Sequence, residues 1–105
     1  MDNNENTDLV YDKIINFSNY IKDNLIKYID NDKEKENALF NLSLVQSYPV
    51  FMVKIGFSEV FDPSKSNDEI IKGICEDYFF DFSKLTEDEK SKINRYCDCF
   101  KKILH

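Results

Sequence analysis

The stretch TDLVYDKIINFSNYIKDNLIKYI, residues 7–29, decides the fold. Its apolar side chains recur at steps of three or four residues, which gathers them on one side of an α-helix: Val10, Ile14, Phe17, Ile21, Leu25 and Tyr28. Thr7 is a residue type that caps helices, and Asp8 places a negative charge in the first turn, where it is favourable. The pattern predicts a helix from about Thr7 to about Ile29. Residues 1–7 are polar, and we expect them to be disordered.

A second helix is predicted after a charged turn, with its cap at Asn31 or Asp32. Its main apolar face contains Ala38, Leu39, Leu42 and Val45. Phe40 and Leu44 lie off that face, so we expect this helix to be covered on more than one side.

The next segment, residues 50–57, is apolar and rich in β-branched and aromatic side chains. We interpret it as a short buried helix, with Gly56 at its end or at a close packing contact. Periodicity alone does not exclude a strand in so short a run. A short strand or hairpin around residues 50–61 is therefore the alternative.

Two further helices are predicted in the C-terminal half, after a break at Asp62-Pro63-Ser64. Each begins with the pattern of a capping box, Ser66 to Glu69 and Thr86 to Glu89. The first has an apolar stripe of Ile70, Ile71, Ile74, Cys75, Tyr78, Phe79 and Phe82. The second has a stripe of Ile93, Tyr96, Cys97, Phe100, Ile103 and Leu104.

The composition agrees with one helical domain. The chain has 105 residues, which is enough for a single core, and only two glycines and two prolines, too few for a β-sandwich or a glycine-rich phosphate loop. We therefore predict an all-α protein, a single compact bundle of four or five helices over residues 8–105. An α+β fold with the strand at residues 50–61 is the alternative.

The charge balance bears on the partners and the location of the protein. The formal net charge is −6 and Arg95 is the only arginine, which argues against direct binding of nucleic acid. The N-terminus does not have the pattern of a secretory signal, and charged and polar residues interrupt the most apolar region, residues 38–57, so we expect a cytoplasmic protein that does not enter a membrane. The abundance of Asn, Lys and Ile is typical of a low-GC genome.

The candidate chemical groups are few. Three cysteines, Cys75, Cys97 and Cys99, do not form a disulfide framework, and together with His105 they are the only soft metal ligands. Residues two apart on a helix point about 200° apart, so Cys97 and Cys99 do not converge. We interpret Cys75 and Cys97 as small core residues and predict no metal and no cofactor. The only histidine is the last residue, so we predict that the protein is not an enzyme.

Acidic residues are the remaining functional signal: Glu76, Asp77, Asp81, Glu87, Asp88 and Glu89. Such a set is often only helix-capping groups and solvated surface. The functional hypothesis is that they dock a partner protein with a basic surface, such as a nucleic-acid-binding protein, which this module regulates or inhibits. One alternative is a structural homo-oligomer, which the apolarity of residues 38–57 favours. Another is a small metal- or cysteine-dependent protein.

Overall fold

The computed structural model describes the backbone of residues 3–48, 50–78 and 80–105, and the side chains of these residues except 3–8 and 50–52. Within these ranges the chain is all-α, as predicted, with five α-helices and no strand. The α-helices are α1 (Asn3–Tyr20), α2 (Asp32–Ser47), α3 (Val50–Val60), α4 (Asn67–Asp77) and α5 (Glu87–Ile103). The radius of gyration, 13.6 Å, is close to the roughly 13 Å expected for a compact domain of about this length.

The alternative strand at residues 50–61 is wrong, because α3 is helical from Val50 to Val60 and Phe61 lies in the turn that follows. The helix is less buried than the sequence suggested. Val53 is buried, whereas Ile55 is 47% exposed and Gly56 is exposed. An added methyl group at Gly56 would meet nothing within 4 Å, so this glycine marks neither the helix end nor a close contact.

The first helix is longer and less regular than expected. It begins at Asn3, before the predicted cap, and it continues beyond Tyr20 as a π-helical turn, η1 (Ile21–Leu25), and a 3-10 turn, η2 (Ile26–Tyr28). Met1 and Asp2 lie outside the described residues, and disorder of residues 1–7 stays a prediction. The stripe is confirmed, because its members from Val10 to Leu25 are at most 3% exposed.

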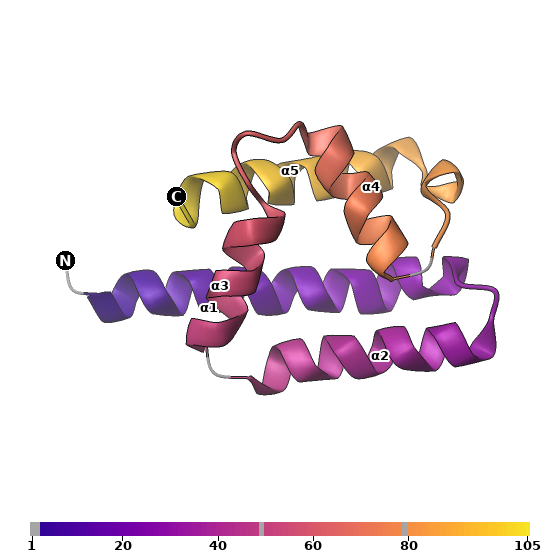
Figure 1. The fold of residues 1–105 in the computed structure, drawn as a ribbon, viewed down its shortest axis with the longest axis horizontal. Coiled ribbons are helices and arrows are strands. Elements are labelled where there is room, and N and C mark those ends of the chain that lie inside the picture. Colours follow the sequence, from indigo (N-terminus) through magenta and orange to yellow (C-terminus); the bar gives the residue numbers. More distant parts are fainter. Residues whose placement is uncertain (1–2, 49, 79) are drawn as a thin grey trace.

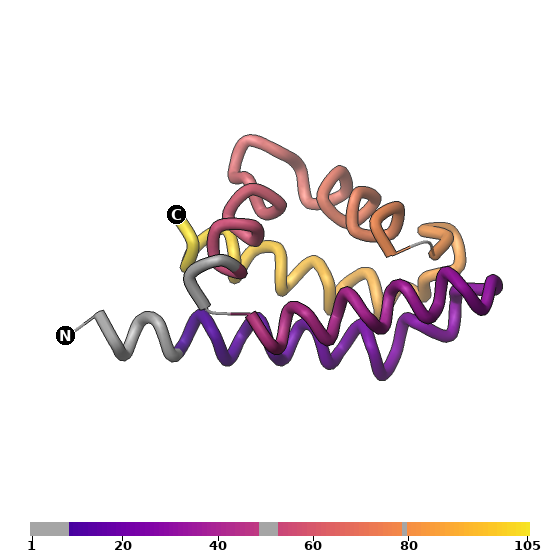
Figure 2. The backbone as a smooth tube through the Cα atoms, turned by 60° about the horizontal axis from the view of Figure 1, so that its bottom comes forward, coloured from indigo at the N-terminus to yellow at the C-terminus, as the bar shows by residue number. Residues whose placement is uncertain are grey.

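Two helices run alongside α1 and two cross it. In Figure 1, α2 and α5 lie along α1 and run opposite to it, whereas α3 and α4 cross its direction steeply. The rotated view of Figure 2 shows α2 returning beside α1. This pair is also joined by a hydrogen bond from Gln46 Nε2 to Asn19 Oδ1 at 2.7 Å. The centre of the bundle is aromatic, with Phe17 of α1 in ring contact with Phe57, Phe61, Tyr96 and Phe100.

The caps follow the sequence closely. Asn31 accepts a hydrogen bond from Glu34 N at 3.0 Å, and Thr86 and Glu89 form the complete capping box of α5. Ser66 caps α4, where its hydroxyl accepts from Glu69 N at 3.2 Å.

The helix predicted from Ile70 through Phe82 is too long. The helix α4 ends at Asp77, where Phe80 N donates to Cys75 O at 3.0 Å across a wider turn. Asp81 then caps a separate 3-10 turn, η3 (Phe82–Lys84). Phe79 lies outside the described residues.

Candidate functional site

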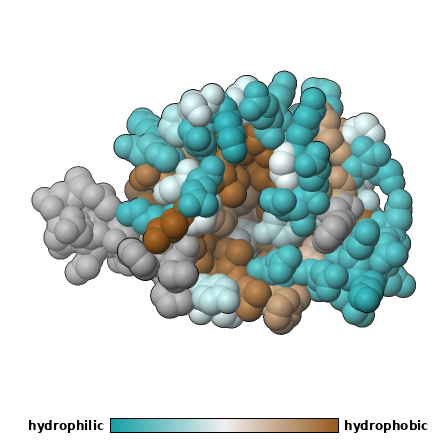
Figure 3. Space-filling model, viewed as in Figure 1, coloured by the Kyte–Doolittle hydropathy of each residue, from teal (hydrophilic) through white to brown (hydrophobic). Residues whose placement is uncertain are grey.

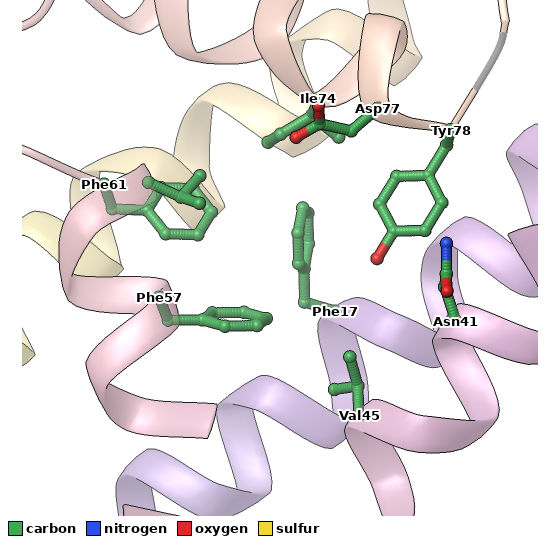
Figure 4. A pocket seen from close by; sticks show the side chains of 9 residues that line it. Phe17, Asn41, Val45, Phe57, Phe61, Ile74, Asp77 and Tyr78 are labelled. Atoms are coloured by element: carbon green, nitrogen blue, oxygen red, sulfur yellow. The ribbon is translucent and has the colours of Figure 1, made fainter. Parts of the chain in front are cut away.

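An apolar cavity opens on the face of the molecule where α2, α3 and α4 surround the middle of α1. Its volume is about 410 Å³. Phe17 occupies its centre, with Phe57, Phe61 and Tyr78 arranged around it (Figure 4). Among the residues whose side chains the structure describes, its lining is Phe17, Asn41, Val45, Phe57, Val60, Phe61, Ile74, Asp77 and Tyr78.

A second cavity of about 400 Å³ extends the first between α2 and α3. It is lined by Leu44, Val45, Tyr48, Val53, Gly56, Phe57 and Val60. Val45, Phe57 and Val60 belong to both cavities, so the two form one depression, which we call the α2–α3–α4 groove. Figure 3 shows hydrophobic side chains gathered in the middle of this face with hydrophilic ones around them.

The outer side of α2 adds exposed apolar surface beside the groove. Phe40, Leu44 and Tyr48 are four residues apart and therefore lie on one side of the helix. Phe40 is 63% exposed and Tyr48 is 51% exposed. The prediction that α2 is covered on more than one side is wrong for the isolated chain, because only Ala38 and Leu42 of this helix are buried. The two off-face residues, Phe40 and Leu44, were the signal that could have located this surface.

The six predicted acidic residues lie in different surroundings. Asp77 lines the α2–α3–α4 groove, and Glu76 is exposed next to it at the end of α4. Asp81 is exposed and accepts hydrogen bonds from Ser83 Oγ at 2.8 Å and Ser83 N at 2.9 Å, and these bonds lower the pKa of its carboxyl. All three carboxylates remain accessible to a partner.

Glu87 and Asp88 lie in the first turn of α5, where they complement the positive end of the helix dipole. Glu87 lines a separate depression with Asp68, and its carboxylate is 3.8 Å from Lys90 Nζ. It therefore does not line the groove that Asp77 lines.

Glu89 points into the protein and is only 9% exposed. Its Oε1 accepts hydrogen bonds from Tyr28 Oη at 2.7 Å and from Thr86 N at 2.9 Å, and its Oε2 is 3.8 Å from Lys27 Nζ. Burial opposes ionisation of this carboxyl, but the hydrogen bonds from Thr86 and Tyr28 outweigh burial and lower its pKa. Glu89 thus joins η2 to the start of α5 and is not presented to a partner.

A positively charged crevice lies between α1 and α5, and the sequence interpretation missed it. It has a volume of about 290 Å³ and is lined by Lys13, Lys92, Arg95, Tyr96 and Cys99. Its cations come from two helices far apart in sequence. Only the three-residue spacing of Lys92 and Arg95 hinted at it, because residues so spaced are neighbours on a helix.

The cysteines and the histidine do not converge on a metal. Among the residues that the structure describes, no three His, Cys, Asp or Glu side chains are placed to hold an ion together. Cys75 and Cys97 are buried, and burial raises the pKa of each thiol to about 12. Cys99 is half-buried, and His105 Nε2 lies 3.0 Å from Ser58 O.

The length and hydropathy of the described helices do not allow any of them to span a bilayer. Comparison with protein-family models, with curated proteins and with solved structures gives no match. The fold and the groove define the class of protein: a small all-α bundle with an apolar surface groove and acidic residues at one end of it.

Proposed function

We propose that this protein is an interaction module, which binds a partner protein through the α2–α3–α4 groove and the acidic end of α4. The observation that carries the proposal is the groove itself. Its walls include Tyr48, 51% exposed, and Val60, 37% exposed, at the edge of an aromatic floor. Apolar patches with polar rims are typical of protein-binding sites in small soluble domains.

The charge of the molecule supports a basic partner. Glu76, Asp77 and Asp81 are exposed around the end of α4, and the whole chain carries a net charge of −6. Opposite potentials speed the encounter of two proteins and disfavour acidic competitors. A partner that uses its basic surface to bind nucleic acid would be inhibited when this module occupies that surface.

Site-specific cross-linking in cells of the native host tests the proposal. A photo-reactive phenylalanine analogue is placed at position 48 or 60 in the groove, or at the exposed position 22 on η1 as the control. We expect a discrete adduct with one partner from the groove positions and not from the control. The identified partner is then purified and its affinity measured for the wild type and for Val60→Lys. Equal affinities, or adducts that do not depend on position, would exclude the groove as the binding surface.

A homo-oligomer is the second candidate, and the outer side of α2 favours it. Phe40 is 63% exposed and Leu39 is 37% exposed, although both are large apolar residues. A second copy could cover them by packing α2 against α2. Light scattering over a range of concentrations, with Phe40→Lys as the variant, tests this candidate. A dimer that the substitution dissociates would support it, and a monomer at all concentrations would exclude it.

A further inference from the structure

The α2–α3–α4 groove has the length of a short helical contact. Asn41 and Tyr48 mark its two ends along α2. These residues are seven positions apart, and a helix rises 1.5 Å per residue, so the groove extends along about 10 Å. An amphipathic helix that contacts a groove through residues i, i+3 or i+4, and i+7 needs this same length.

The walls match the apolar side of such a helix. Phe57 and Val60 of α3 face the groove on one side, Val45 of α2 lies on the other, and Phe17 forms the floor. Each of the two cavities, about 410 and 400 Å³, has a volume typical of pockets that bind ligands. The two cavities share Val45, Phe57 and Val60, so together they offer one continuous apolar surface to the apolar side of a helix.

The negative charge in the groove favours a ligand with a positive charge. Asp77 is the one charged residue in the described lining of the two cavities. Within the described parts of the chain the carboxylate of Asp77 is in no ion pair. The three lysines that do form ion pairs there, Lys27, Lys84 and Lys90, contact other carboxylates. A Lys or Arg at the end of a bound helix would pair with Asp77 and remain close to Glu76.

We infer that the groove binds an amphipathic helix of the partner protein, with apolar residues at i, i+3 or i+4, and i+7, and with a Lys or Arg that pairs with Asp77. The inference rests on the proposed function and names the chemistry of its partner. Strand addition is a poor alternative, because the described residues present no sheet edge to which a strand could bind.

Selection from a displayed library of random 16-residue peptides on the immobilised full-length protein tests the inference. We expect the enriched peptides to have the helical spacing of apolar residues and a positive net charge. In solution, circular dichroism of a selected peptide should show helix formation on binding. Enriched peptides that are acidic, proline-rich or unpatterned, or no enrichment that depends on the groove, would overturn the inference.

Three variants locate the binding. Val60→Lys should weaken a selected peptide at least tenfold, because it places a cation in the apolar groove. Asp77→Asn should weaken it about two- to fivefold and reduce its salt dependence, as expected for an exposed ion pair. Asp12→Asn makes the same change in charge at an exposed position on α1, outside the groove, and should leave binding unchanged. Equal effects of the Asp12 and Asp77 variants would show general attraction to an acidic protein and would contradict the inference.

The cross-linking and peptide experiments separate the two proposals. A failure to cross-link any partner from positions 48 and 60 removes the proposed function. A cross-linked partner whose contacting segment is extended or acidic leaves the proposed function standing and removes the basic helix. Adducts between two copies of this chain assign the groove to self-association and remove both.

Discussion

Glu89 shows how one residue can connect two distant parts of this protein. Its carboxylate completes the capping box of α5. It also accepts a hydrogen bond from the hydroxyl of Tyr28, which lies at the end of η2. Ser66, the N-cap of α4, is simpler. Among the described hydrogen bonds, its hydroxyl accepts only the one from Glu69 N. The two N-caps therefore provide a matched comparison.

We predict that Thr86→Ala destabilises the protein more than Ser66→Ala does. Loss of an N-cap costs about 1 kcal/mol, within a range of about 0.5–2. We expect Thr86→Ala in the upper half of this range, because the lost bond from Glu89 N to Thr86 Oγ1 helps to fix the turn from which Glu89 reaches Tyr28. Urea denaturation measures both free energies of unfolding. Equal losses would show that the contact between Tyr28 and Glu89 adds nothing to the cap.

The pH dependence of stability follows from the lowered pKa of Glu89. Its pKa in the folded protein lies below the ordinary value of 4.5, so the charged form is favoured by folding. This contribution is fully present above the unfolded pKa and is lost as the pH falls through the folded pKa. Asp62 and Asp81 act in the same direction, because hydrogen bonds from Ser64 and Ser83 lower their pKa values.

We predict that the free energy of unfolding declines as the pH falls below about 4.5, and that Glu89→Gln declines less steeply. Glutamine also serves in a capping box, so this variant removes the titration and keeps the geometry. Chemical denaturation at a series of pH values between 3 and 7 measures the slopes. Parallel curves for the wild type and the variant would refute the assignment to Glu89.

The capping box of Glu89 was predictable from the sequence, and its hydrogen bond from Tyr28 was not. Thr86 and Glu89 are three residues apart, so their capping box is visible in the sequence and is confirmed. Tyr28 is 61 residues from Glu89, and only the packing of η2 against the start of α5 brings them together. For this reason the sequence placed Glu89 with the surface carboxylates.

At the scale of elements, the turn η1 explains how one apolar stripe continues over 20 residues or so. Steps of four residues, such as Ile21 to Leu25, drift around a regular α-helix of 3.6 residues per turn. A π-helical turn, with its i to i+5 hydrogen bonds, takes up one more residue, so Leu25 and Ile26 remain buried. The stripe predicted the helix, but single-sequence periodicity does not reveal where a turn widens.

The two helical glycines give a prediction for α3 and α4. Gly56 and Gly73 lie inside these helices, and an added methyl group would meet no atom within 4 Å at either position. Alanine is about 1 kcal/mol more favourable than glycine in a helix interior. We therefore expect Gly56→Ala and Gly73→Ala each to raise the melting temperature by about 5 °C.

Calorimetry of the two alanine variants checks this expectation, and peptide binding separates them. Gly56 lines the groove, whereas Gly73 does not, so only Gly56→Ala should alter the affinity for a selected peptide. A loss of stability in either variant would mean that the helix packs more closely at that glycine than the structure shows.

At the scale of the whole molecule, the groove forms because α2, α3 and α4 each cover only part of the surface of α1. The helix α2 turns Ala38 and Leu42 toward the core and leaves Phe40 outside. The helices α3 and α4 cross α1 steeply (Figure 1), and the cavity beside them reaches down to Phe17, which is itself only 3% exposed. The sequence marked these residues as apolar, but it did not show which of them the bundle would leave uncovered, because crossing angles depend on contacts between remote segments.

Thiol chemistry tests this packing in one experiment. Cys75 of α4 and Cys97 of α5 are both buried, and their pKa values of about 12 leave almost no thiolate at pH 8. Cys99 is half-buried in the crevice with Lys92 and Arg95, which attract an anionic reagent. We predict that an anionic aromatic disulfide reagent modifies one thiol per native chain rapidly and the other two only as fast as the protein opens. In guanidinium chloride all three of the chain's cysteines should react together.

Variants assign the rapid phase and separate charge from exposure. Cys99→Ser should abolish the rapid phase. Arg95→Gln should slow the anionic reagent several-fold, because it removes one cation of the crevice, but it should leave the rate with neutral iodoacetamide nearly unchanged. Two rapid thiols in the native protein would show that α4 and α5 do not enclose both Cys75 and Cys97. Since α4 also forms one wall of the groove, that result would remove the structural basis on which both binding proposals rest.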